Sequence, residues 1–249
     1  MGEWLPLLLL ISLRSFALEE QRHRSEPLAR ATIPSFSHSP LPHSLILPLK
    51  SSPSQNCIVG LRPGAKTDTP MITVISGTNR SNSRTLQIAR HFTAQLSELG
   101  AETQLLNLAE VDMGHYVEEM YDPKAMAPAL VALQAKYILD VKKIVFVVPE
   151  YNGSFPGVVK LFIDGISINE YPKNLGDSHI ALIGVSSGKA GNLRGLDHLT
   201  SIVNHMGGSV IPNKLPLSNV DALINDAGEL DHEPTDLALK KLAAQLIAA

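Results

Sequence analysis

Residues 72–85, ITVISGTNRSNSRT, decide the fold. The β-branched run at their start predicts a buried strand, and the hydroxyl, amide and glycine residues that follow predict a turn into a helix. Residues 144–157, IVFVVPEYNGSFPG, show the same order of strand, polar loop and helix start. Strands that pass through short loops into helices build parallel sheets that are covered by helices on both faces. The two stretches therefore predict an α/β fold.

From Met71 onward, strand-like and helix-like segments alternate five times. The expected strands are 72–76, 103–108, 143–148, 179–186 and 209–212. The expected helices are 83–99, 125–140, 156–169, 191–206 and 234–248. This alternation predicts a doubly wound, five-stranded parallel sheet in the order 2-1-3-4-5. Strands one and three are neighbours in that order, so we expect the two polar loops to lie side by side at the C-terminal edge of the sheet.

Residues 1–70 differ in composition from the rest of the chain. They hold nine of the seventeen prolines and lack a sustained period, so we expect a disordered Pro/Ser-rich extension before a single domain at 71–249. An apolar stretch within residues 4–17 resembles a secretory signal, but no Lys or Arg precedes it. The alternative, which we favour, is a start codon assigned too far upstream, with Met71 as the initiator of a cytoplasmic protein.

Charge and cysteine content exclude several classes of protein. Residues 71–249 carry fourteen Lys and Arg against nineteen Asp and Glu, without a basic stripe, which argues against nucleic-acid binding. The single cysteine, Cys57, rules out intrachain disulfides, thiolate zinc sites and iron–sulfur clusters, so we expect no metal. No apolar stretch has the length that a bilayer-spanning helix needs, and we expect no membrane span.

The first polar loop has the residue types of a phosphate site. Several N–H donors, short hydroxyl side chains and the guanidinium of Arg80 occur together just before a helix. The alternative is a plain polar turn in which Ser81 or Asn82 caps that helix. The residue types alone leave both interpretations open.

The second and third loops would bring further backbone N–H groups to the same edge. Asn152 and Gly153 predict a tight turn with positive φ, although an ordinary strand-to-helix turn with a packed Tyr151 is the alternative. Residues 186–192, SSGKAGN, follow the fourth strand and allow the backbone to approach a ligand closely.

At this point the sequence resembles a known family. Ser-Gly-Thr-Asn-Arg-x-x-Ser after the first strand, together with PEYNGSFPGVVKLFID at 149–164, resembles the NADPH-dependent FMN reductases, which include quinone, azo-dye and chromate reductases. The resemblance covers 71–249 and implies a flavodoxin-like fold, bound FMN and NAD(P)H as the reductant. It also implies a small-molecule electron acceptor and assembly into a homodimer or homotetramer.

The resemblance carries the family's cofactor-binding residues over by position. Those expected at the FMN phosphate are Ser76, Thr78, Arg80, Ser83 and Thr85. Those expected at the isoalloxazine ring are Pro149, Glu150, Tyr151, Asn152 and Gly153. Those expected at its pyrimidine side are Ser187, Gly188 and Gly191.

Two positions depart from the family pattern. Many relatives have Asn where Thr85 stands, and Trp where Gly165 follows the helix aspartate. We expect hydride to pass from NAD(P)H to the flavin and then to the acceptor, and no side chain is expected to act as a catalytic base. The alternative function is a flavodoxin-type electron carrier or redox-sensing module that binds FMN without nicotinamide turnover.

Overall fold

The computed structural model of this protein describes residues 71–249. The expected disordered extension, the signal-like segment at 4–17 and Cys57 lie outside the described residues. Within the described part, none of the helices has the length and apolar character needed to cross a membrane.

The strands form the predicted parallel sheet. Its main path runs β2-β1-β3-β4-β5, which confirms the order 2-1-3-4-5 and the flavodoxin-like fold. The bounds are Met71–Ser76 for β1, Glu102–Asn107 for β2, Lys143–Pro149 for β3, His179–Val185 for β4 and Ser209–Val210 for β5. β3 and β4 are buried along nearly their whole length, as expected of central strands with helices on both faces.

A sixth strand was not predicted from the sequence. β6, Leu215–Leu217, pairs in parallel with β4, so that Pro216 lies opposite Gly184. The expected count of five strands is thus one short. The segment reads Leu-Pro-Leu, and its length and central proline are both unfavourable signals for a strand.

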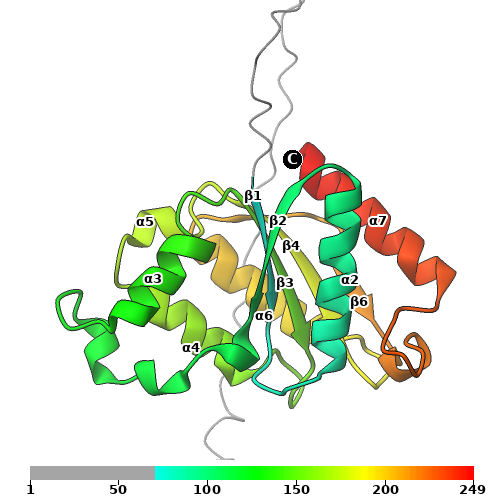
Figure 1. Cartoon of the computed structure of the whole chain (residues 1–249), viewed down its shortest axis with the longest axis horizontal. Helices are drawn as coiled ribbons and strands as arrows, with labels where there is room; N and C mark the ends of the chain where they lie inside the picture. The colour runs from blue at the N-terminus through cyan, green and yellow to red at the C-terminus, as the bar shows by residue number, and fades with distance from the viewer. Residues whose placement is uncertain (1–70) are drawn as a thin grey trace, which may run out of the picture. The chain divides into compact units, whose positions relative to one another are not determined.

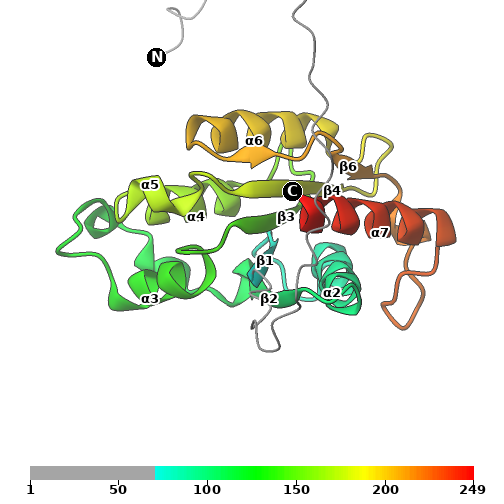
Figure 2. The same cartoon turned by 90° about the horizontal axis from the view of Figure 1, so that it is seen from above.

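Helices cover both faces of the sheet. Figures 1 and 2 show α2 (Arg84–Glu98) and α7 (Glu233–Ala248) on one face and α3 (Pro128–Tyr137) and α4 (Gly157–Ile166) on the other. α6 (Leu193–His205) packs into the same apolar core as α3 and α4.

Each face has its own apolar core. Phe92, Leu96 and Leu239 belong to the first, and Phe162 and Leu199 to the second. Both cores contain side chains of β1, β3 and β4, so helices pack against each of these strands from both faces and hold their C-terminal ends in place.

The short elements lie in the connections. They are η1 (Leu108–Glu110), η2 (Met113–His115), η3 (Glu118–Tyr121), α5 (Tyr171–Asn174) and η4 (Val220–Ala222). α3 is shorter at both ends than the predicted helix 125–140. It begins at a proline, which lacks the N–H that a helix interior requires.

Gly165 on α4 packs against an aromatic ring from another element. A Cβ at Gly165 would lie 2.6 Å from Cε1 of Tyr116, so this ring leaves no room for a side chain at residue 165. The Tyr116 hydroxyl is buried without a hydrogen-bond partner among the described residues. Burial raises the pKa of Tyr116 to about 12, so the phenol stays neutral.

Candidate functional site

The first two polar loops meet at the edge where β1 and β3 end. Ser76 lies opposite Val147 in the parallel register, and the Gly77 N–H donates to the Val147 carbonyl at 2.8 Å. The contact is close because Gly77 has no side chain. A Cβ there would lie 2.8 Å from a methyl group of Val148 and 2.8 Å from one of Val159. The predicted side-by-side placement of the two loops is confirmed.

A cleft of about 480 Å³ opens at this edge. It is bounded by the first, second and third loops and by η4. The lining residues are Arg80, Ser81, Asn82, Ser83, Arg84, Thr85, Pro149, Glu150, Tyr151, Val185, Ser186, Ser187, Val220 and Asp221. Seven of the thirteen predicted site residues are among them: Arg80, Ser83, Thr85, Pro149, Glu150, Tyr151 and Ser187.

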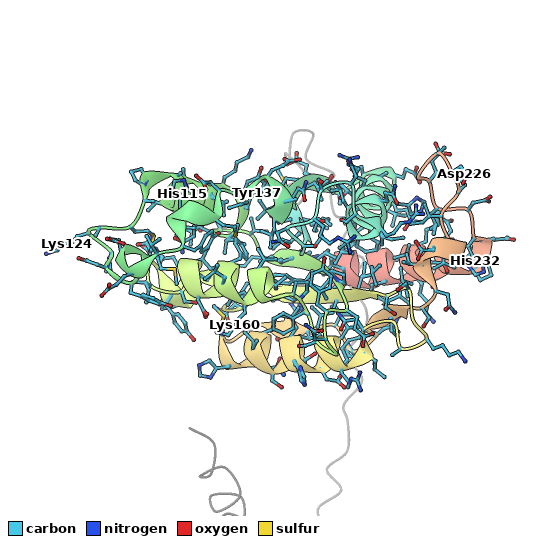
Figure 3. The ribbon with its side chains drawn as sticks, turned by 90° about the horizontal axis from the view of Figure 1, so that it is seen from below. His115, Lys124, Tyr137, Lys160, Asp226 and His232 are labelled. Carbon is cyan, nitrogen blue, oxygen red and sulfur yellow. The ribbon has the colours of Figure 1, made fainter. Side chains whose placement is uncertain are left out.

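A smaller hollow of about 340 Å³ lies away from these loops, between β2 and α3. His115 and Tyr137, the last residue of α3, line it, and Figure 3 shows both away from the end of the molecule that carries Asp226 and His232. None of the predicted site residues line this hollow. The larger cleft is therefore the candidate site.

One wall of the cleft is the start of α2. The Ser83 side chain accepts a hydrogen bond from Leu86 N–H at 3.1 Å and so caps the helix. The backbone N–H groups of Ser81, Asn82, Arg84 and Thr85 have no partner within the described part of the chain.

The charges around this wall favour an anion. The first turn of α2 contains no acidic residue, and the guanidinium of Arg80 is exposed at the rim. Unpartnered N–H groups at a helix N-terminus attract anions, phosphate above all.

Two predicted phosphate residues lie behind this wall. Ser76 and Thr78 are fully buried, and neither lines the cleft. Ser76 Oγ has no hydrogen-bond partner among residues 71–249. Thr78 Oγ1 accepts the Arg80 N–H at 3.2 Å and lies 3.0 Å from the phenol oxygen of Tyr151.

The second loop has a rigid backbone. Tyr151 and Ser154 exchange two backbone hydrogen bonds of 2.8 and 3.1 Å. The turn between them has φ of 52° at Asn152 and 78° at Gly153, which is the predicted tight turn with positive φ. Asn152 and Gly153 do not line the cleft, whereas Glu150 and Tyr151 do.

The third loop is ordered by its own contacts. Ser186 Oγ donates to the Gly188 carbonyl at 2.9 Å and accepts the Gly191 N–H at 3.1 Å. A side chain at Gly191 would collide with Pro216 of β6, whose carbonyl carbon would lie 2.6 Å from the Cβ. Of the three residues predicted here, only Ser187 lines the cleft. Gly188 and Gly191 instead bond to the Ser186 side chain and so order the loop.

Seven lining residues were not among the predicted site residues, and three of them, Arg84, Val220 and Asp221, form one side of the cleft. Arg84 Nε donates to Asp221 Oδ1 at 3.0 Å, and this ion pair and Val220 close the side of the cleft formed by η4. Asp221 is 137 positions from Arg84 in the chain. No local pattern in the sequence signals such a pairing, whereas Arg80, the cationic residue of the first loop, was predicted from the sequence.

The residues present at the cleft fit FMN. Its phosphate needs several N–H donors and a cation, which the start of α2 and Arg80 supply. Its ring needs a rigid surface and fixed N–H groups that are free to donate: internal hydrogen bonds hold the loops at 149–154 and 186–191, and the Ser187 and Gly188 N–H groups have no partner among the described residues. Both carboxylates that line the cleft have a cationic partner: Asp221 pairs with Arg84 at 3.0 Å, and Glu150 pairs with Arg194 at 3.4 Å.

Known proteins resemble this chain in sequence and in fold. An FMN-dependent NADPH-azoreductase of Staphylococcus aureus is 24% identical over 162 residues, which cover 62% of this chain and 80% of the relative. The flavoenzyme NAD(P)H:(acceptor) oxidoreductase FerB of Paracoccus denitrificans has a similar structure. Its TM-score is 0.58 at 21% identity, over 72% of this chain and 96% of that one.

An oxidoreductase of Corynebacterium diphtheriae also shares the fold, with a TM-score of 0.54 at 17% identity over 72% of this chain and 96% of its own. The family model described as NADPH-dependent FMN reductase matches residues 70–222, which include all three loops of the cleft. Because the match spans more than half of the chain, this protein belongs to the NADPH-dependent FMN reductase family.

Proposed function

We propose that this protein passes hydride from NAD(P)H, through FMN, to a small acceptor such as a quinone, an azo compound, a free flavin or an oxidised metal. Family membership gives the enzyme class, an NAD(P)H-dependent oxidoreductase, and the cofactor, FMN. The observation that carries the proposal is the wall of unpartnered N–H groups at the start of α2, opposite the rigid loop at 149–154.

The residues of the cleft divide into two groups by their chemistry. Arg80, Ser83 and Thr85 would hold the phosphate, together with the free N–H groups around them. Glu150, Tyr151 and Ser187 would lie along the ring. The glycines and Asn152 would keep the loops in the conformation that presents these groups.

Bound FMN would supply the hydride chemistry itself. The protein must orient the nicotinamide and the acceptor, exclude water and stabilise the negative charge that develops on reduction. The second loop is held by the sheet, since Glu150 N–H donates to the Val185 carbonyl at 2.9 Å, and the Ser187 and Gly188 N–H groups of the third loop have no partner within the described part of the chain. Dipoles that are already fixed stabilise developing charge without reorganisation.

The direct test uses the purified full chain loaded with FMN. We expect anaerobic NADPH or NADH to bleach the flavin absorbance, and a quinone or an azo dye to restore it with steady turnover. A protein that binds FMN but is not bleached by either nucleotide would contradict the proposed enzyme activity.

A flavodoxin-type electron carrier is the second candidate, but no specific observation favours it. Carriers usually present a strongly acidic face to their partners, and residues 71–249 have a net charge of only about −5, from fourteen basic and nineteen acidic residues. The same bleaching experiment separates the two functions, because a carrier would be reduced by a protein partner and not by the nucleotide.

We also propose a homodimer or homotetramer that works in the cytoplasm, where NAD(P)H is available. The support is the resemblance to the family. Light scattering of the full chain with bound FMN would give the mass of the assembly, and a monomer at micromolar concentration would contradict this part of the proposal.

A further inference from the structure

Tyr151 belongs to the loop expected at the flavin ring, yet its hydroxyl group contacts the loop expected at the phosphate. The phenol oxygen lies 3.0 Å from Thr78 Oγ1, across 73 positions of sequence. Either oxygen can donate in this bond. The contact joins two loops that come from different strands, β1 and β3.

Thr78 occupies a central position in the phosphate loop. Its side chain is fully buried, so it is shielded from a ligand in the cleft. Its Oγ1 accepts the Arg80 N–H and thereby closes the turn that presents the Arg80 side chain and the N–H groups after it. Holding Thr78 in place therefore holds the donors that face the cleft.

Tyr151 can hold Thr78 in place, because hydrogen bonds restrain the loop of Tyr151 at several positions. Its N–H and carbonyl both bond to Ser154. The preceding residue, Glu150, bonds to β4, and the Asn192 side-chain amide donates to the Pro149 carbonyl at 2.8 Å. The phosphate loop is much less restrained, since residues 78–82 have only the bonds made by Thr78 within the described part of the chain.

We propose that Tyr151 is a positioning residue, which orders the phosphate loop through Thr78 and so couples the ring end of the FMN site to its phosphate end. Thr78 then acts from behind the loop instead of touching the phosphate. This inference rests on the proposed function, because it concerns FMN binding. The consequence is that removal of the Tyr151 hydroxyl, which lies beside the ring, weakens the binding of the phosphate at the other end of the FMN site.

The test is a double-mutant cycle on the full chain, with FMN affinity measured by fluorescence titration of the apoprotein. Loss of one hydrogen bond predicts that Y151F binds FMN about three- to tenfold more weakly than the unchanged protein. In a T78V background the same Tyr151→Phe change has no further effect, because its partner is already absent. T78S keeps the hydroxyl and binds FMN within about twofold of the unchanged protein.

Hydrogen exchange of the apoprotein adds a readout that does not depend on FMN. We expect faster exchange at residues 79–82 in Y151F than in the unchanged protein. Y137F is the matched control, since Tyr137 ends α3 and lines the smaller hollow (Figure 3), so this change should alter neither the exchange nor the affinity.

Two results would overturn the coupling alone. One is an equal loss from Tyr151→Phe in both backgrounds, which would mean that the phenol acts on FMN directly. The other is unchanged affinity and exchange in Y151F. If the unchanged protein fails to bind FMN, the proposed function fails, and the coupling fails with it.

Discussion

Replacing Gly77 by alanine tests the packing that brings the first two loops together. The added Cβ would lie 2.8 Å from a methyl group of Val148 and of Val159, and 3.1 Å from the Val147 carbonyl oxygen. Carbon atoms in contact prefer about 3.5–4.0 Å, so something must move. Both valines are fully buried, and β-branched side chains have few alternative rotamers.

Overpacking of this kind costs roughly 1–3 kcal/mol. For G77A we take about 2 kcal/mol, because the movement also strains the 2.8 Å bond from Gly77 N–H to Val147. In a domain of this size that corresponds to a fall in Tm of about 4–8 °C. The shift should also separate the phosphate loop from β3 and weaken FMN binding.

The assay is thermal unfolding of the full chain by circular dichroism, with FMN titration beside it. G157A is the matched control: a Cβ at Gly157, the first residue of α4, meets no atom within 4 Å. The control should keep the Tm of the unchanged protein or raise it slightly, because alanine favours the helix. If G77A unfolded at the unchanged Tm, or G157A lost as much as G77A, the reasoning about loop contact would be wrong.

Three further changes test other parts of the structure. Hydrogen bonds from Lys240 and then His91 lower the pKa of Asp236, so its contribution to stability is fully present above the ordinary value of 3.8 and is lost as pH falls through the lowered pKa. D236N should lose about 1 kcal/mol of unfolding free energy in urea at pH 7 and progressively less as pH falls below 3.8; an equal loss at neutral and acid pH would refute this. Y116F removes a buried hydroxyl without a partner, so it should be neutral or stabilising by about 1 kcal/mol, and a clear fall in Tm would reveal a missed hydrogen bond. S83A removes the cap of α2 and should cost about 1 kcal/mol of stability and weaken FMN binding; full retention of both would contradict its double role.

The sequence was sufficient for the order of the main strands. In the strand predicted at 143–148, residues 144–148 form a continuous apolar run, as expected of a strand with helices on both faces, and the alternation with helices indicates the parallel topology. β6 could not be predicted, because Leu215–Leu217 becomes a strand only through its pairing with β4. The boundaries of α3 also depend on tertiary packing more than on local pattern.

The site was predictable in its residue types but not in its geometry. Arg80, Ser83 and Tyr151 are visible as loop residues next to strand ends, and they line the cleft. Whether a hydroxyl faces a ligand or lies behind a loop depends on side-chain direction, which is why Thr78 could not be distinguished from Ser83. Asp221 enters the cleft through a long-range ion pair that has no sequence signature.

The central claim is that the start of α2 binds the phosphate of FMN. The most direct measurement compares FMN with riboflavin, which lacks only the phosphate, by calorimetric titration of the full-length apoprotein. Charge-assisted hydrogen bonds to the phosphate should make FMN bind at least about 100-fold more tightly. Equal affinities for the two flavins, or no binding of either, would contradict the account.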